Sequence, residues 1–281
     1  MYKYLVLSRY HHWIKNFLIF VPTILSYSQL NSFEILKLII LFASLSFLSS
    51  VVYVINDIKD VDQDRIHPKK RIRPIASGEI SEKHAKYFLI LLSIPIIISI
   101  YFLSNFYLLI IFILFFLNSF FYTFYFKKIR YFEILIVSLN YVLRIYAGAL
   151  LLDITVTEWA ILIVYLGSTY IFLSKRILNK NFSSSIYINE NLSKSFLIKK
   201  LFKANLIVLC LLIIYYIFFI NLILIPVGII VIYILYDYYQ KLNYQVDIGN
   251  YDPVDLLLKN RIYLFLLFVA LIYMLMIYKL N

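Results

Sequence analysis

The sequence "NDIKDVDQDRIHPKKRIRPIASG" occupies residues 56–78 and directly follows the apolar run 33–55. It contains four Asp and six Lys or Arg, with the acids in its first half and most of the bases in its second. An apolar run long enough to cross a bilayer, followed at once by dense charge, indicates a helix that ends at a membrane surface. The stretch therefore predicts a membrane protein with a charged site at the membrane boundary.

The composition supports a membrane protein. Hydrophobic residues make up 63% of the 281-residue chain and charged residues only 15%, whereas a soluble domain is usually nearer half apolar and a quarter charged. Five Gly and six Pro exclude a loop-rich fold. The single cysteine, Cys210, lies within an apolar run and cannot form a disulfide framework.

Nine segments approach the roughly 20 apolar residues that a membrane-spanning helix needs. They are residues 14–30, 33–55, 85–104, 106–126, 132–152, 157–174, 203–221, 222–240 and 261–279. Asn221 and Pro226 predict a tight turn between the seventh and eighth segments. The sequence thus predicts an all-α integral membrane fold of nine transmembrane helices, formed by one domain over residues 1–281.

The basic residues gather in alternate connections between these segments. If the N-terminus is cytoplasmic, only Lys37, Arg144 and Lys279 of the 27 Lys and Arg lie away from the cytoplasmic side. The positive-inside rule predicts this asymmetry. The net charge of +12 is therefore attributed to membrane topology and not to nucleic-acid binding.

The acids of the opening stretch recur with helical spacing. Asn56, Asp60 and Asp64 are four residues apart, and Asp57 falls on the same stripe, whereas Asp62 points elsewhere. Carboxylates stacked in this way repel one another and need a counter-ion. Oxygen ligands suit Mg²⁺. Asn56, Asp57, Asp60 and Asp64 are therefore predicted to hold Mg²⁺, and the three Asp of this set are predicted to be catalytic residues.

A basic loop follows the acids. Pro68 and Pro74 prevent one continuous helix through it. Its candidate substrate-binding residues are Arg65, Lys70, Arg71 and Arg73. Guanidinium groups favour phosphate oxygens, and a metal site beneath basic side chains suits a diphosphate. The alternative is a solvated cytoplasmic loop whose charges only set the topology.

These residues resemble a known family. "NDIKDVDQDR" is similar to the first aspartate-rich motif, N-D-x-x-D-x-x-x-D, of the UbiA-type membrane prenyltransferase superfamily. "DRIHPKKRIRPIASGEIS" looks like its decaprenyl-phosphate phosphoribosyltransferase branch, as do "HHWIKNFLIFVP", "VLRIYAGALLL", "SKRILNK" and "DPVDLLLKNR". The chain departs from the branch at Arg9-Tyr10, where Arg-Pro is usual, at Ser174, and within residues 177–200. The resemblance implies the nine-helix fold.

The second half of the chain helps to choose the reaction. The motif loop of this half, residues 175–202, corresponds to the loop of the first half, residues 56–84. Both loops are predicted to be cytoplasmic. "SKRILNKNFSSSIYINENLSKSFLIKK" has one acid, Glu190, and six bases. Prenyltransferases of this superfamily use a second aspartate cluster, whereas a basic loop suits a second phosphate.

The resemblance and this loop together imply a Mg²⁺-dependent transfer of 5-phosphoribosyl from 5-phosphoribosyl 1-diphosphate to a polyprenyl phosphate, for lipid-linked sugar synthesis at the cell membrane. One alternative is a prenyltransferase that joins a polyprenyl diphosphate to an aromatic acceptor. The other is a transporter or channel, which would show broken helices and internal repeats.

The remaining candidate substrate-binding residues are Lys15, Asn16, Tyr122, Lys127, Arg144, Lys175 and Arg176. Snorkelling of the side chain to the membrane surface remains an alternative role for Lys15 and Arg144. A charge within a span is a functional hypothesis by default, however. Tyr122 could equally be one of the aromatic residues that gather at membrane boundaries.

Overall fold

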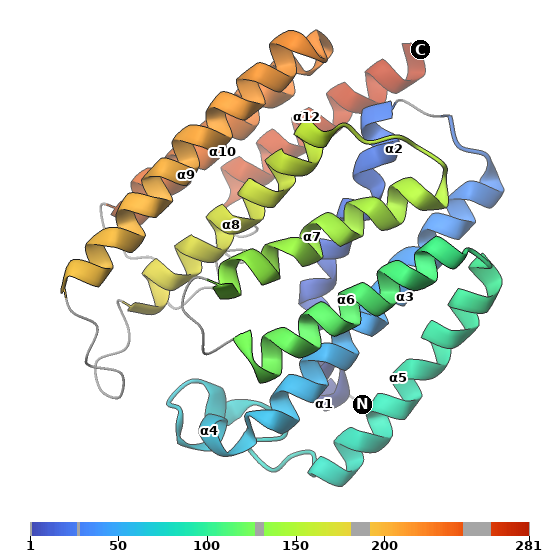
Figure 1. The fold of residues 1–281 in the computed structure, drawn as a ribbon, viewed down its shortest axis with the longest axis vertical. Coiled ribbons are helices and arrows are strands. Elements are labelled where there is room, and N and C mark those ends of the chain that lie inside the picture. Colours follow the sequence, from blue (N-terminus) through green and yellow to red (C-terminus); the bar gives the residue numbers. More distant parts are fainter. Residues whose placement is uncertain (1, 27–28, 127–131, 181–191, 244–259, 281) are drawn as a thin grey trace. The chain divides into compact units, whose positions relative to one another are not determined.

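The structure is a computed structural model that describes residues 2–26, 29–126, 132–180, 192–243 and 260–280. Every regular element within these ranges is helical (Figure 1). The chain divides into two compact units, Met1–Val156 and Thr157–Asn281. The predicted all-α architecture is thus confirmed.

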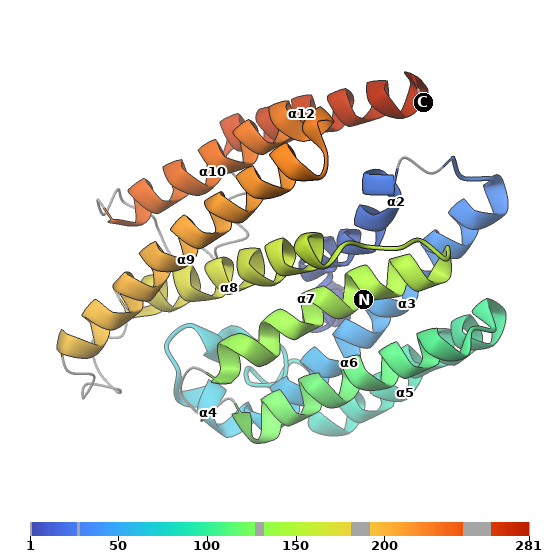
Figure 2. The ribbon, with the colours of Figure 1, turned by 45° about the horizontal axis from the view of Figure 1, so that its top comes forward.

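The first unit begins with short helices and continues with long ones (Figures 1 and 2). Its elements are α1 (Tyr2–Ser8), the 3₁₀ helix η1 (Tyr10–Phe20), α2 (Val21–Ser26), α3 (Ser32–Lys59), α4 (Val61–Ile66), the 3₁₀ turn η2 (Lys70–Ile72), α5 (Glu82–Leu103), α6 (Phe106–Phe124) and α7 (Phe132–Leu151). Helix α3 packs against α1, η1, α5, α6 and α7, so it is the central helix of this unit.

Helix α3 starts at a capping box. Asn31 Oδ1 accepts from the backbone N–H groups of Phe33 and Glu34, and the Glu34 carboxylate accepts from the backbone N–H of Asn31. These bonds satisfy backbone donors that a helix N-terminus leaves without partners. The helix then continues to Lys59, past the predicted end at residue 55, and so carries the first acids of the charged stretch.

The 3₁₀ helix η1 lies along a serine-rich face of α3. Trp13 Nε1 donates to Ser50 Oγ at 3.0 Å, and Asn16 Nδ2 donates to Ser46 Oγ at 2.9 Å. Residues three apart line up on a 3₁₀ helix, so Trp13, Asn16 and Ile19 can all face inward, and the last two are fully buried. Small serine side chains let two helices approach closely in a membrane.

Helix α7 covers the other side of η1. A Cβ atom at Gly148 would lie 1.9 Å from the carbonyl oxygen of Ile19. Only glycine therefore permits this approach. The contact fixes η1 between α3 and α7, and with it the position of the residues at the start of η1.

The second unit also contains long helices. Its elements are α8 (Glu158–Lys180), α9 (Leu192–Phe219), the 3₁₀ turn η4 (Leu222–Leu224), α10 (Ile225–Asn243) and α12 (Arg261–Leu280). The predicted break near Asn221 and Pro226 is present between α9 and α10. The Tyr170 ring stacks on Phe202 with 4.4 Å between centroids, and its hydroxyl donates to the carbonyl of Leu235, which joins α8 to α9 and α10.

Seven helices in the described ranges are long and apolar enough to cross a membrane. The predicted first span, 14–30, is not one α-helix but η1 followed by α2. Pro22 explains the change, because proline lacks an N–H and is accommodated best in the first turn of a new helix. The described apolar part of α12, Arg261–Met274, is also shorter than a span. The count of nine and the cytoplasmic N-terminus remain predictions.

Candidate active site

Three buried aspartates lie where α3 meets α4. Asp57, Asp60 and Asp64 are 3%, 8% and 2% exposed. Asp60 bends the chain between the two helices, yet its N–H donates to the carbonyl of Asn56 at 2.9 Å and its carbonyl accepts from the N–H of Asp64 at 2.8 Å. Helical spacing therefore continues through the bend. Asp62, predicted to point elsewhere, is exposed.

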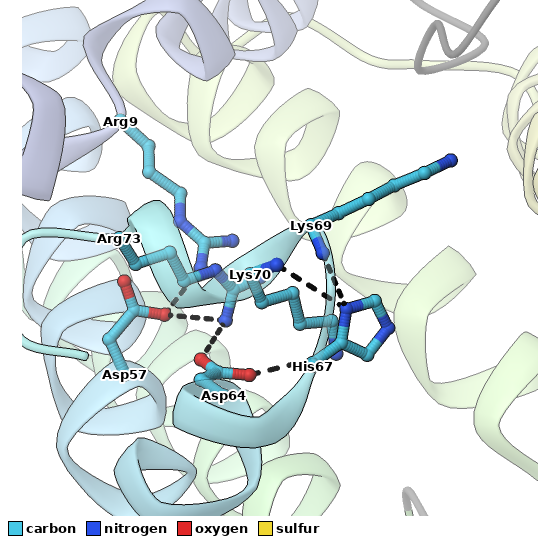
Figure 3. Close-up of polar contacts among 7 residues, drawn as sticks. All are labelled: Arg9, Asp57, Asp64, His67, Lys69, Lys70 and Arg73. Carbon is cyan, nitrogen blue, oxygen red and sulfur yellow. Dashed lines mark hydrogen bonds and ion pairs between the residues drawn. The ribbon is translucent and has the colours of Figure 1, made fainter. Parts of the chain in front are cut away.

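Arg73 bridges two of these acids. Its Nη1 lies 3.2 Å from Asp57 Oδ1 and 2.5 Å from Asp64 Oδ2 (Figure 3). Lys70 Nζ lies 3.9 Å from the other oxygen of Asp64. Two of the four bases predicted to bind substrate thus lie beside the predicted metal ligands, and they neutralise buried carboxylates that would otherwise be costly.

The loop that carries Arg73 is anchored in the interior. Ile75 and Ile80 are each 2% exposed, and the N–H of Ile80 donates to the carbonyl of Pro74 at 2.9 Å. Gly78 adopts a φ of 83°, a left-handed conformation that glycine tolerates without strain. Burying the two isoleucines therefore holds the loop against the acids.

Arg9 is a site residue that the sequence did not reveal. Its Nη2 contacts Asp57 Oδ1, and its guanidinium lies 4.9 Å from the centroid of the Tyr53 ring. The Arg9 backbone is left-handed, with φ 50° and ψ 47°, a conformation that costs energy for a residue other than glycine. No role in the site was predicted for Arg9 from the sequence, because no local spacing connects it to an acid 48 residues away.

His67 orients the basic loop. Its Nδ1 accepts from the backbone N–H of Lys69 at 3.2 Å and of Lys70 at 3.3 Å. Partial burial and the nearby Lys70 charge lower the pKa of His67 below 6.5, although Asp64 opposes this. In Figure 3 the Lys70 side chain turns toward the acids, whereas Lys69 points away from them. The sequence assigned no role to His67.

The acids offer a suitable donor set for a divalent cation. Asp57 Oδ1 and Asp64 Oδ2 both contact Nη1 of Arg73. Two carboxylate oxygens therefore already point toward one positively charged group. Mg²⁺ commonly uses one or two carboxylates and completes its shell with water and substrate phosphates. Within the described residues no three His, Cys, Asp or Glu side chains are grouped tightly enough to hold an ion. The geometry therefore suits a two-carboxylate Mg²⁺ site, and the roles of Asn56 and Asp60 as ligands remain predictions.

Arg65 and Arg71 are not in contact with these acids among the interactions that the structure shows. Arg65 Nη1 lies 3.3 Å from Asp62 Oδ1 on the exposed side of α4. Arg71 belongs to η2, and its side chain is exposed. Their roles in substrate binding remain predictions.

Asn16 and Arg144 belong to a buried polar network. Arg144 is 5% exposed; its Nε donates to Asn16 Oδ1 at 2.6 Å and its Nη1 to the carbonyl of Asn140 at 2.7 Å. The guanidinium also lies 4.8 Å from the centroid of the Phe115 ring. The charge within α7 is thus accommodated by groups of η1, of α6 and of α7 itself, so snorkelling to the membrane surface does not describe it.

The other predicted residues are spread along the chain. Lys15 and Tyr122 are half-buried on η1 and α6. In the second unit, Lys175 is exposed and Arg176 half-buried on α8. Lys127 lies outside the described residues. The binding roles of all five remain predictions.

The second unit holds an acid that the sequence did not single out. Asp237 Oδ2 accepts from Lys241 Nζ and from the Tyr263 hydroxyl, each at 2.6 Å. These bonds join α10 to α12. The i, i+4 spacing of Asp237 and Lys241 could have indicated the first bond, but nothing local indicated the tyrosine.

The chain is similar to a known family and to named members of it. The sequence profile of the UbiA prenyltransferase family matches residues 17–247. The decaprenyl-phosphate phosphoribosyltransferase of Mycobacterium tuberculosis is 30% identical over 172 residues, which are 60% of this chain and 57% of that protein. The protein of the same name from Mycolicibacterium smegmatis is 31% identical over 173 residues, 60% and 54% of the respective chains. The matches thus span a little over half of these relatives.

A solved structure shows the same fold. The UbiA homolog from Archaeoglobus fulgidus bound to DMAPP and Mg²⁺ has a TM-score of 0.75 and is 16% identical, covering 99% of this chain and 100% of that one. A sequence identity of 16% is evidence for a shared fold and not for a shared function. With the apolar helices, it establishes a multi-pass membrane protein.

Proposed function

Because the chain belongs to the UbiA prenyltransferase family, we propose that it transfers 5-phosphoribosyl from 5-phosphoribosyl 1-diphosphate to a polyprenyl phosphate and releases diphosphate. The chain is thereby a membrane transferase. Its curated relatives at about 30% identity carry the name of this reaction, and residues 56–78 resemble the corresponding motif. The product is a lipid-linked sugar for envelope glycan synthesis.

The observation that carries the proposal is the arrangement of acids and bases in the first unit. Two buried carboxylates, Asp57 and Asp64, lie against Arg73, with Arg9 and Lys70 beside them. The donor is itself polyanionic, with a diphosphate and a separate phosphate. Guanidinium and ammonium groups bind phosphate oxygens through strong charge-assisted hydrogen bonds. The cluster therefore offers donors for the diphosphate at the place where the acids can accept a metal.

We assign the metal site to Asp57 and Asp64, with Asn56 and Asp60 as further predicted ligands. When bound there, Mg²⁺ supplies positive charge to the departing diphosphate. The solved UbiA homolog with DMAPP binds this ion, which supports the assignment by analogy of fold.

The reaction exchanges one C–O bond for another. The bond between ribose C1 and the diphosphate oxygen breaks, and its electron pair leaves with the diphosphate. An oxygen of the lipid phosphate then forms the new bond to C1. That oxygen is anionic at neutral pH, so no strong general base is required. The protein contributes position and charge: its cations hold the phosphates while the apolar surroundings limit water.

We further propose that the site faces the cytoplasm and that the protein resides in the cell membrane, with its N-terminus on the cytoplasmic side. The excess of bases in alternate connections supports this orientation. The basic segment that begins at Lys175 and Arg176 is proposed to bind a second phosphate of the substrates. The nine-span topology belongs to the same proposal.

The test is a transfer assay on the purified protein in detergent. Radiolabelled 5-phosphoribosyl 1-diphosphate, a polyprenyl phosphate and Mg²⁺ are supplied, and label is counted in the organic phase. We expect label in the lipid that depends on Mg²⁺ and is lost in Asp60→Ala. Absence of transfer, combined with turnover of a prenyl diphosphate and an aromatic acceptor, would overturn the proposed reaction and favour the prenyltransferase alternative.

A further inference from the structure

The arginines beside the acids contact the oxygens that a metal would use. Asp57 Oδ1 accepts from both Arg9 and Arg73, and Asp64 Oδ2 accepts from Arg73 at 2.5 Å. Mg²⁺ binds carboxylate oxygens at about 2.0–2.1 Å. An ion at that distance from these oxygens would lie close to both guanidiniums, and like charges repel strongly where water is limited. The contacts of this structure and metal coordination by the same oxygens therefore exclude one another.

We infer that Arg9 and Arg73 are exchangeable counter-ions: they neutralise Asp57 and Asp64 until a divalent cation takes these oxygens, and then move to the phosphate oxygens that accompany the cation. This inference rests on the proposed diphosphate site. It adds Arg9 to the site and makes the binding of cation and diphosphate interdependent.

The geometry permits this exchange without a change of fold. The side chains of Arg9 and Arg73 are 18% and 23% exposed, whereas that of Asp57 is only 3% exposed. The acids are fixed within helices, and the arginines reach them from two separate segments, the α1–η1 junction and the loop after η2. Rotation of the long arginine side chains is therefore sufficient to move their charged ends.

The backbone around each arginine is held in place. Ser50 Oγ donates to the carbonyl of Ser8 at 2.9 Å, next to Arg9. On the other side, the N–H of Ser77 donates to the carbonyl of Arg73 at 2.8 Å. A released guanidinium thus stays within side-chain reach of the acids, where the phosphate groups of a metal-bound ligand would lie.

Exchange has a thermodynamic consequence. A divalent cation alone must displace two guanidiniums and leave them without anionic partners, so it binds weakly. Diphosphate gives the displaced arginines new partners and favours the cation. Coupling between two ligands is reciprocal, so the cation must strengthen diphosphate binding by the same factor.

The experiment measures two affinities of the full chain in detergent. Electron paramagnetic resonance of free Mn²⁺ gives the affinity for the cation alone, and equilibrium dialysis with excess Mn²⁺ gives the affinity for radiolabelled inorganic diphosphate. The variants are Arg73→Gln and Arg9→Gln. The control is Lys86→Gln, which removes one positive charge from an exposed position on α5.

We expect opposite changes in the two arginine variants. Mn²⁺ alone should bind roughly tenfold more tightly, because a competing charge-assisted hydrogen bond is gone. Diphosphate should bind roughly tenfold more weakly, because a phosphate donor is gone. Lys86→Gln should leave both affinities as they are. Changes of the same sign in both affinities, or no change, would show fixed structural ion pairs and overturn the inference.

Folding is checked by thermal unfolding of each variant, and the two arginines give independent tests if one variant fails to fold. Arg73→Lys retains the positive charge and should lie between the wild type and Arg73→Gln in both affinities. The measurements contain neither ribose donor nor lipid. If the two affinities change in opposite directions but the protein transfers nothing to lipid, the exchange of counter-ions is supported and the proposed reaction is overturned. If the protein transfers phosphoribosyl to lipid but the affinities are unchanged in the variants, the proposed reaction is supported and the exchange is overturned.

Discussion

Arg144 and Asn16 are 128 residues apart in the chain, yet Arg144 Nε donates to Asn16 Oδ1 at 2.6 Å inside the first unit. Asn16 in turn donates to Ser46. The pair thereby connects α7, η1 and α3 through one line of buried polar groups. Such groups are costly when they lose a partner, so the pair positions η1 and the Arg9 at its start.

Arg144→Met is expected to destabilise the fold by about 3 kcal/mol, because it leaves the buried Asn16 Oδ1 and the carbonyl of Asn140 without their charged donor. Thermal unfolding in detergent measures the effect, and Arg144→Lys should restore part of the stability. A higher KM for 5-phosphoribosyl 1-diphosphate with unchanged thermal stability would instead show that Arg144 binds substrate.

Gly148→Ala is expected to destabilise the protein by about 1–3 kcal/mol or more, because the added Cβ meets the backbone carbonyl of Ile19 and backbone cannot rotate away. Gly167→Ala is the matched control, since a Cβ there has no neighbour within 4 Å and alanine favours the helix. Equal thermal stability of the two variants would contradict the close packing of η1 and α7.

His67 should make the basic loop sensitive to acid. Its folded pKa lies below the ordinary 6.5, so the neutral ring is favoured in the folded protein. The stabilisation it gives is complete above pH 6.5 and is lost as the pH falls through the lower folded pKa. Protonated Nδ1 cannot accept from the N–H groups of Lys69 and Lys70.

The measurement is the change in melting temperature between pH 8 and pH 5. In His67→Asn the side-chain oxygen still accepts but does not titrate, so we expect a smaller loss of stability on acidification than in the wild type. His11→Asn, a change at an exposed position on η1, should behave like the wild type. An identical pH dependence in all three proteins would refute this role of His67.

Asp57→Asn and Asp64→Asn should each lower the transfer rate by about a hundredfold, since each removes a charged metal ligand near the reacting diphosphate. Asp62→Asn, which alters an exposed acid paired with Arg65, should retain more activity than either. Removal of divalent ions with EDTA should abolish transfer, and added Mg²⁺ should restore it. The transfer assay in detergent tests all of these; full activity in EDTA would rule out the metal.

Much of the local structure could be predicted from sequence. The apolar runs predicted helical membrane segments, and the spacing of Asp57, Asp60 and Asp64 placed three acids on one stripe. All three acids are buried even though the chain bends at Asp60. Pro68 and Pro74 correctly indicated that no continuous helix runs through the basic loop, which contains only the 3₁₀ turn η2. These features depend on residues only a few positions apart, so a periodic pattern is sufficient to reveal them.

The sequence by itself therefore determined the helical membrane class, the family resemblance, and the order of acids and bases in residues 56–78. Tertiary structure alone decided which cation meets which acid: Arg9 on Asp57 from 48 residues away, and Arg73 between Asp57 and Asp64. It also made residues 10–20 a 3₁₀ helix, which packs closely against α7 at Gly148 and Ile19. The physical reason is that periodicity reports the faces of a single helix, whereas contacts between distant segments depend on how closely the helices can pack.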